Sequence, residues 1–157
     1  MRAPPAIGRR RLLQGALLRG AGVGVAGSLV RSAAAAVAPD EALAFASRSL
    51  SAAIDALGGV PQASALITLE LPQVAEDGAY VPITVGSRIA GTREILILVD
   101  GNPQPLAVRF TIPDGTEPFI ATRIRMAQSG TVYAAVRTDD GFFATARTAQ
   151  VTVGGCG

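Results

Sequence analysis

The feature that most constrains the fold of this chain is a series of short β-prone segments that begins after residue 59. The stretches between the segments concentrate Gly, Pro, Asp and Asn, which are the residues that turns require. The segments are 65–71, 80–85, 94–99, 106–112, 119–126, 131–137, 142–147 and 149–153. Seven or eight short strands separated by turns predict an all-β fold, specifically a β-sandwich.

Several positions allow more detailed predictions. Residues 94–99 read EILILV and are apolar at successive positions, which indicates a central strand buried on both faces. Pro82 cannot donate to a sheet ladder, so its segment is predicted to be an edge strand or to begin near the proline. TDDG at 138–141 predicts a β-hairpin, and AEDG at 75–78 predicts a turn.

The segment before the strands has a helical period. Apolar residues within 40–57 recur at spacings of three and four, two acidic residues suit the first turn, and a Gly-Gly pair follows the last turn. We therefore predict one helix over 40–57. It lies in an N-terminal helical segment, 37–60, that precedes the sandwich at 61–153.

Residues 1–36 have the composition of an export signal. The cluster Arg9-Arg10-Arg11 is followed by two leucines, as in the twin-arginine motif, and small residues suited to cleavage lie near residue 36. The apolar run at 20–30 has 11 residues, against the roughly 20 that a membrane-spanning helix needs. We predict a twin-arginine signal peptide that is removed after export to a bacterial periplasm, and no stable membrane association. The alternative is a basic amphipathic helix that stays at a membrane surface.

The charge of the chain is divided unequally along its length. Six of the fourteen arginines precede residue 37, where there is no Asp or Glu. The remaining eight arginines face all twelve carboxylates, which gives that part a net charge of −4. The basic character therefore belongs to the leader, and we expect no nucleic-acid partner.

The absence of histidine and lysine, together with a single cysteine, limits the chemistry of the chain. Histidine is the usual general base and the commonest metal ligand, so Ser-His-Asp and Cys-His enzymes are excluded. One cysteine without histidine also argues against zinc, haem and copper sites. We expect no metal and no cofactor in this chain.

Two groups of charged residues are candidate sites. Arg123 and Arg125 alternate along one predicted strand, so both guanidinium groups leave the same face. The pair could hold an anion, but we interpret it as part of a solvated sheet face. Glu76 and Asp77 are adjacent, and neighbouring side chains of an extended chain point apart, so we do not interpret them as an acid/base pair.

Cys156 is the one residue whose surroundings favour a function. It has no cysteine partner within the chain and is flanked by Gly154, Gly155 and Gly157, which give a thin and flexible backbone. It lies three residues beyond Val153, the expected end of the last strand, and three residues can extend about 10 Å. No basic side chain in the tail activates the thiol, so its pKa is expected near the usual value of about 8.5. A thiol on a thin arm is suited to carry a covalently bound group to several enzymes.

This tail and several internal segments resemble the SoxY family, the sulfur-compound carrier subunits of the bacterial thiosulfate-oxidising (Sox) system. The resemblance lies in AEDGAYVPITV, in the Asn102-Pro103-x-Pro105 turn, in EPFIATRIRMAQSGTVYAAV and in the closing VTVGGCG, in the family's order. It implies an immunoglobulin-like β-sandwich, covalent substrate attachment at Cys156, and a swinging arm at 154–157 formed by Gly154, Gly155 and Gly157.

The resemblance also implies the partners of the chain. They are a SoxZ-like subunit in a heterodimer, a haem c enzyme that couples thiosulfate to the thiol, a dimanganese thiosulfohydrolase that releases sulfate, and in some systems a sulfane dehydrogenase. The chain itself is then a non-catalytic carrier. The family's tail usually reads GGCGG, whereas this tail reads GGCG, which brings the terminal carboxylate one residue closer to the sulfur.

Two other functions remain open from the sequence. An immunoglobulin-like structural domain could use Cys156 for an intermolecular disulfide. A sulfurtransferase could use the same thiol as a nucleophile, but the chain offers no base to activate it.

Overall fold

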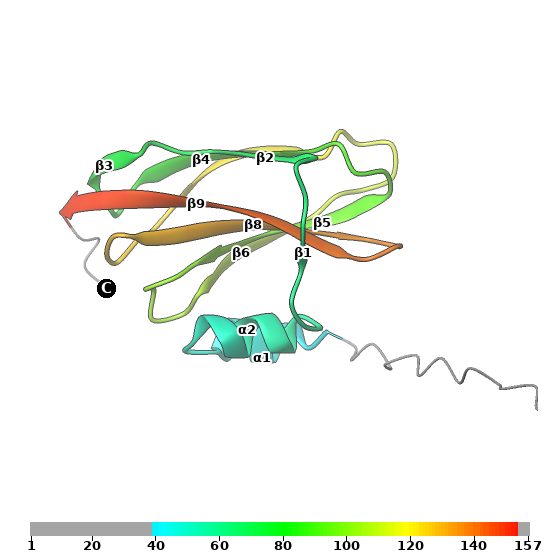
Figure 1. Cartoon of the computed structure of the whole chain (residues 1–157), viewed down its shortest axis with the longest axis horizontal. Coiled ribbons are helices and arrows are strands. Elements are labelled where there is room, and N and C mark those ends of the chain that lie inside the picture. Colours follow the sequence, from blue (N-terminus) through cyan, green and yellow to red (C-terminus); the bar gives the residue numbers. More distant parts are fainter. Residues whose placement is uncertain (1–38, 154–157) are drawn as a thin grey trace, which may run out of the picture. The chain divides into compact units, whose positions relative to one another are not determined.

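The computed structural model describes residues 39–153, all of which belong to one compact unit, Ala35–Gly157. Figure 1 shows these residues as short helices and two layers of strands. The elements are α1 (Glu41–Ala46), α2 (Leu50–Ala56), β1 (Gln62–Ala63), β2 (Ile67–Glu70), β3 (Val74–Asp77), β4 (Val81–Ser87), β5 (Thr92–Val99), β6 (Leu106–Thr111), β7 (Phe119–Ile124), β8 (Gly130–Thr138) and β9 (Phe142–Val153). The predicted signal peptide and the predicted swinging arm lie outside the described residues.

The strands form two sheets that stack face to face (Figure 1). The larger sheet has the strand order β1-β9-β8-β5-β6, with β3 also paired to β9, and the smaller has the order β2-β4-β7. Buried apolar side chains from both sheets form the core between them. This immunoglobulin-like β-sandwich confirms the all-β prediction, although the described residues form nine strands rather than seven or eight.

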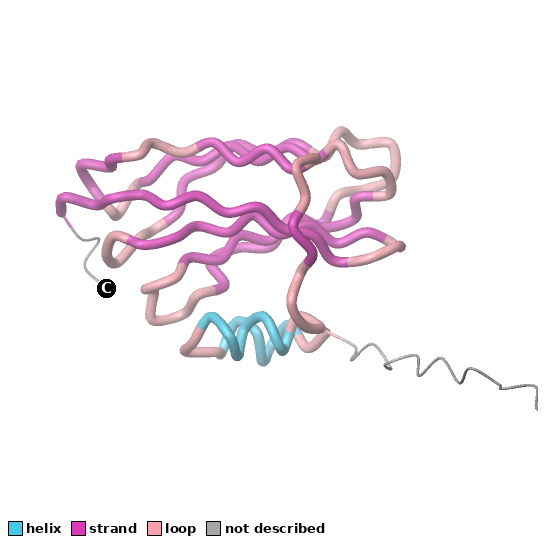
Figure 2. The backbone as a smooth tube through the Cα atoms, in the orientation of Figure 1, coloured by secondary structure: helices cyan, strands magenta, loops and turns pink. Residues whose placement is uncertain are grey.

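Strand β5 lies inside the large sheet and separates two apolar cores. Ile95, Ile97 and Val99 belong to the core between the sheets. Leu96 and Leu98 point to the other face, where they pack with buried residues of the helices. The prediction of a central strand buried on both faces is confirmed, because α1 and α2 cover the outer face of the large sheet (Figure 2).

The N-terminal segment forms two short helices, so the prediction of one helix over 40–57 is wrong. After α1, Ser47 turns its hydroxyl back to the carbonyl oxygen of Leu43, at 2.7 Å. Ser49 then begins α2, and its side-chain oxygen accepts a hydrogen bond from Ala52 N at 3.3 Å. Serine side chains compete for backbone hydrogen bonds and favour caps over helix interiors, so the Ser-Arg-Ser stretch interrupts the helical period.

Two strand boundaries near the end of the sandwich also differ from the prediction. The turn predicted at 75–78 is wrong, because Val74–Asp77 forms strand β3, with Ala75 buried. Its two acidic residues give the segment little β-propensity, so its extended conformation depends on pairing with β9. The strands predicted separately at 142–147 and 149–153 form the single strand β9. The two-residue strand β1 was not predicted.

Pro82 lies near the start of β4, the middle strand of the small sheet. The prediction of an edge strand is wrong, but the alternative, a strand that begins near the proline, is confirmed. β2 pairs with β4 only from Thr84 onward, so Pro82 has a neighbour on one side alone, Arg123 of β7. The missing amide therefore leaves no gap in a ladder on the side of β2.

The β8–β9 hairpin is confirmed as predicted. The two strands are antiparallel, with Arg137 opposite Phe142, and Thr138 N donates to Gly141 O at 2.9 Å across the turn.

Charged side chains attach the helices to the large sheet. Glu94 on β5 accepts hydrogen bonds from Arg109 on β6 and from Arg137 on β8. Arg109 also pairs with Glu41 of α1, and Arg137 donates to the carbonyl oxygen of Leu57 at 2.7 Å. The hydrogen bond to Glu94 raises the pKa of Arg109. This cluster joins both helices to three strands of the sheet.

Candidate functional site

The candidate site is the end of β9, from which the cysteine tail continues. Cys156, Gly154, Gly155 and Gly157 lie outside the described residues, and the last described residue is Val153. The structure therefore defines the base of the tail. The prediction that 151–153 is a strand is confirmed, because these residues end β9.

The end of β9 extends beyond its partner β8. The pairing of β8 with β9 stops where Gly130 faces Ala149. From Gln150 onward β9 pairs in parallel with β3, and the last pair in the register joins Val153 to Asp77. Figure 1 shows β3 beside the tip of β9.

Hydrogen bonds hold this end of β9 on both sides. Gln150 N donates to Gln73 O at 2.9 Å, on the side of β3. The next amide, Val151 N, donates to the Ser129 side-chain oxygen at 2.9 Å. Because successive amides of a strand point to opposite sides, these two bonds brace the strand from both edges. The Thr152 hydroxyl adds a third bond, to Glu76 O at 2.9 Å.

The loop that precedes β8 is fixed by the loop that follows β5. The Asn102 side chain donates to Arg125 O and accepts from Ala127 N, both at 2.8 Å. Asp100 N donates to Thr131 O at 2.8 Å. These bonds fix Ala127 and Thr131, and Ser129 lies between them, where its side chain bonds to β9. The base of the tail thus rests on a set of cross-linked loops.

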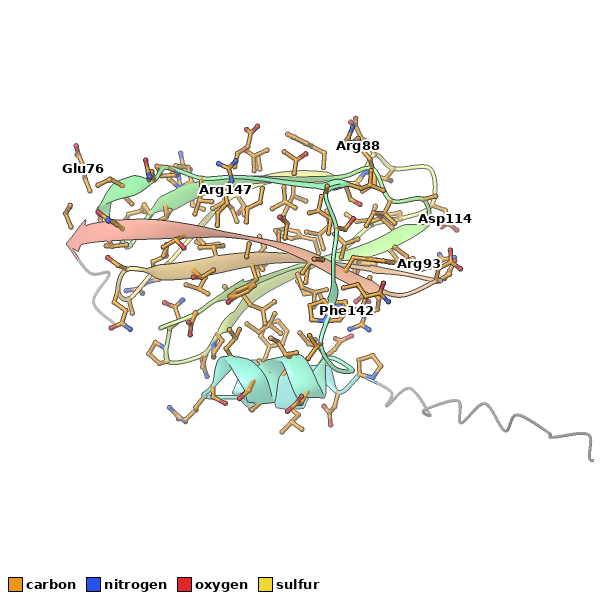
Figure 3. All side chains as sticks on the ribbon, viewed as in Figure 1. Glu76, Arg88, Arg93, Asp114, Phe142 and Arg147 are labelled. Atoms are coloured by element: carbon orange, nitrogen blue, oxygen red, sulfur yellow. The ribbon has the colours of Figure 1, made fainter. Side chains whose placement is uncertain are left out.

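Acidic residues lie directly beside the base. Glu76 is exposed on β3 at the same end of the molecule as the tip of β9 (Figure 3). Asp77, the neighbour of Val153, is also exposed, and its carboxylate accepts a hydrogen bond from Ala79 N at 2.7 Å. This bond shapes the turn from β3 to β4. The side of the base that β3 forms is therefore negatively charged.

Arginines lie on a neighbouring surface of the small sheet. Arg123 and Arg125 are exposed and flank the buried Ile124, in agreement with the prediction that both side chains leave one face. They line a groove of about 460 Å³ together with Ala79 and Tyr80. They also line a second groove, of about 320 Å³, that reaches the loop after β5. Guanidinium groups thus line both grooves.

The ionic cluster at the opposite end of the sandwich is separate from this base. Arg93 pairs with Asp114 and Asp139, and Figure 3 shows Arg93 and Asp114 far from Glu76. The hydrogen bond from Arg93 lowers the pKa of Asp139. All three side chains are more than half exposed, so these ion pairs add little to the stability of the sandwich.

Within residues 39–153, no three carboxylate groups gather as metal ligands would. None of the helices in this part of the chain has the length and apolar character needed to cross a membrane.

Several residues of the base were not predicted from the sequence. Ser129, Thr152 and Asn102 reach partners that are 22 or more residues away in the chain. Only Asn102 had a local signal, because it begins the Asn-Pro-x-Pro turn. Ser129 and Thr152 are ordinary polar residues until the topology places them beside β9 and β3.

Comparison with known proteins identifies the family. A family model described as "Sulfur oxidation protein SoxY" matches residues 34–156, so the match covers the described sandwich and ends on Cys156. A search of curated proteins finds no match. Among solved structures, the chain is similar to the sulfur carrier protein SoxY from Chlorobium limicola f thiosulfatophilum, with 31% identity, a TM-score of 0.55, and coverage of 61% of this chain and 88% of that chain. The chain therefore belongs to the SoxY family.

Proposed function

We propose that this protein is a sulfur carrier that holds intermediates of thiosulfate oxidation on Cys156. The observation that supports this most is the position of the only thiol, three residues beyond a strand end that is braced on both edges. A fixed base and a short glycine segment allow the sulfur to enter a recessed active site while the sandwich stays outside. The similar protein from Chlorobium is itself described as a sulfur carrier.

The chemistry of loading is an oxidation. The Cys156 thiol and thiosulfate join through a new S–S bond, with loss of one proton from the thiol and of two electrons. By the family resemblance, a haem c enzyme accepts the electrons and passes them on. The product is an S-thiosulfonate, Cys–S–S–SO₃⁻. The chain contributes the sulfur and its placement, while the partner contributes the oxidation.

The chemistry of release is a hydrolysis. Water attacks the terminal sulfonate sulfur, the S–S bond to that sulfur breaks, and sulfate leaves with one proton. The thiol then holds one extra sulfur as a persulfide, Cys–S–SH. A dimanganese thiosulfohydrolase is the proposed partner for this step, and a sulfane dehydrogenase is the proposed oxidant of the remaining sulfur where one is present.

The proposed setting is the bacterial periplasm, after twin-arginine export, with a SoxZ-like subunit as the stable partner. The Cys156 thiol can hold one substrate-derived group, and the chain has no histidine or lysine that could act as a general base for it. The protein is therefore proposed to be a carrier without activity of its own and without a resident cofactor.

Replacement of the thiol tests the proposal. Wild-type protein incubated with thiosulfate and the haem c coupling enzyme is expected to gain the mass of the thiosulfonate, whereas Cys156→Ser gains none because no sulfur is available for the S–S bond. Intact-protein mass spectrometry measures both. Equal addition to the two proteins, or no addition to wild type, contradicts the proposal.

The same samples test the alternative of a structural disulfide. A disulfide-linked oligomer on a non-reducing gel, in protein that still cannot be loaded after reduction, would favour an immunoglobulin-like structural domain that uses Cys156 for cross-linking.

The role of the glycine arm is tested by Gly155→Val. A β-branched residue restricts the backbone and widens the arm, so loading by the coupling enzyme is expected to slow by about tenfold or more. The melting temperature is expected to stay unchanged, because the substitution lies beyond the end of β9. Tetrathionate, a small reagent that needs no recessed site, should load this variant at the wild-type rate. Unchanged enzymatic loading would show that the glycines are dispensable.

A further inference from the structure

A groove near the end of β9 carries positive charge from Arg123 and Arg125, which suits an anionic group bound to Cys156, called the load below. It has a volume of about 460 Å³ and is lined by Ala79, Tyr80, Arg123, Ile124 and Arg125. Arg123 is exposed, and within the described residues it forms no ion pair. A guanidinium group offers paired N–H donors that match the oxygens of a sulfonate.

The strand register places this groove within reach of Cys156. Val153 pairs with Asp77, and neighbouring strands lie about 4.8 Å apart. Tyr80 N donates to Asp77 O, so these two residues close one turn and their Cα atoms lie within about 7 Å. Tyr80 is therefore at most about 12 Å from Val153. The three residues from Val153 to Cys156 extend about 10 Å, before the cysteine side chain, its load and the arginine side chain are added.

The large apolar groove of the molecule is beyond this reach. That groove lies between α2 and the start of β9, where it is lined by Ala144, Thr145 and Ala146. Seven residues of extended strand separate Ala146 from Val153, a distance of about 23 Å. The tail cannot fold back that far, so the groove lined by the arginines is the one near enough for its load.

The carboxylates of β3, on the other side of the end of β9, repel an anionic load. Asp77 pairs with Val153 and Glu76 precedes it on β3, whereas Arg123 and Arg125 lie beyond the turn from β3 to β4. A sulfonate on Cys156 is repelled by the carboxylates and attracted to the guanidinium groups, while a neutral load feels neither force.

We propose that the groove lined by Arg123 and Arg125 binds the terminal sulfonate of the loaded tail. This inference rests on the proposed carrier function. In this proposal the thiosulfonate is held against the small sheet. The proposal gives Arg123 a role beyond that of a solvated sheet face.

Chemical loading tests the inference without partner enzymes. The Cys156 thiolate attacks a central sulfur of tetrathionate, its S–S bond breaks, and thiosulfate leaves, which gives Cys–S–S–SO₃⁻ on the full chain. Methyl methanethiosulfonate gives the neutral counterpart Cys–S–S–CH₃, with methanesulfinate as the leaving group. The rate at which dithiothreitol restores the free thiol then measures how well each load is protected.

The expected effect is confined to the sulfonated load and to substitution of Arg123. Arg123→Gln should release the sulfonated load about fivefold faster than wild type, the upper range for an exposed charge pair, and should leave release of the methyl disulfide unchanged. Arg88→Gln is the matched control, because Arg88 is also exposed and forms no ion pair within the described residues but lies at the other end of the sandwich (Figure 3). The difference should disappear at about 1 M salt, where the screening length is about 3 Å.

Two results would overturn the inference. One is a wild-type release rate for the sulfonated Arg123→Gln protein, and the other is an equal change for both loads, which would indicate an effect on the reductant rather than on the sulfonate. Nuclear magnetic resonance gives a second readout, since the Arg123 Nε–H signal should shift on loading with tetrathionate only. Loading by the haem c enzyme is a separate measurement, so failure of this inference and failure of the carrier function are distinguishable.

Discussion

Gly130 is the most crowded of the described glycines near the base of the tail. A Cβ atom at this position would lie 2.4 Å from the carbonyl oxygen of Asp100. That oxygen belongs to the backbone, and Asp100 is held in place by the hydrogen bond from its amide to Thr131 O at 2.8 Å. Neither strand can move away without loss of the cross-linked loops, so only glycine fits here.

Gly130→Ala is therefore expected to lower the free energy of unfolding by about 1–3 kcal/mol, the usual cost of a forced contact in a packed region. Urea denaturation measures this loss. The matched control is Gly86→Ala, since a Cβ atom at Gly86 meets its nearest neighbour, Phe119 Cδ2, at an ordinary 3.7 Å. Equal stability of the two variants would contradict the expectation.

At the scale of single residues, the sequence reveals a residue that is distinctive by its type. It does not reveal an ordinary residue that matters only because the fold places it beside a particular partner. Cys156 is distinctive in any fold, because it is the only thiol and has glycines on both sides. Ser129 becomes important only because its side-chain oxygen meets Val151 N, 22 residues away. Arg123 was noted from its alternation with Arg125, but its relation to the tail depends on the pairing of Val153 with Asp77.

Strand β9 is the element on which the proposed function depends. It has 12 residues and continues past β8, so its last residues have one conventional strand neighbour, the short β3. On the other edge a serine side chain takes the place of a strand. The stability of this end is therefore local and separate from that of the central ladder.

Ser129→Ala should loosen the end of β9 without unfolding the sandwich. Loss of the hydrogen bond to Val151 N is expected to cost about 1 kcal/mol locally and to speed hydrogen exchange of that amide by about fivefold. Exchange at Val136, in the central ladder, should not change. Ser51→Ala on the exposed face of α2 serves as the control. Unchanged exchange at Val151 would mean that β3 alone holds the strand.

Local patterns predicted elements well only where local and tertiary preferences agree. EILILV has high β-propensity and lies between two cores, so its position as the central strand β5 was predictable. The segment Val74–Asp77 has two acids and no alternation, and it is a strand because β9 offers it a ladder. The helical period over 40–57 is real, but it does not show that Ser49 begins a second helix.

On the scale of the whole molecule, the two apolar cores stabilise different parts of the fold. The core between the sheets joins strands of both sheets, and the second core joins the helices to the outer face of the large sheet. The sandwich was predictable because alternating segments and turns recur along most of the chain. Which loops meet at which end was not predictable, because that depends on strand order and register.

The length of β9 also has a mechanical consequence. In the proposed carrier function, a partner draws Cys156 into its active site and pulls along the axis of β9, and the hydrogen bonds of an antiparallel ladder lie across that axis. The eight residue pairs with β8 are then loaded together, in shear, instead of being opened one after another. A force applied at the end of β9 is therefore shared among the hydrogen bonds to β8, and through them it is distributed over the large sheet before any single bond breaks.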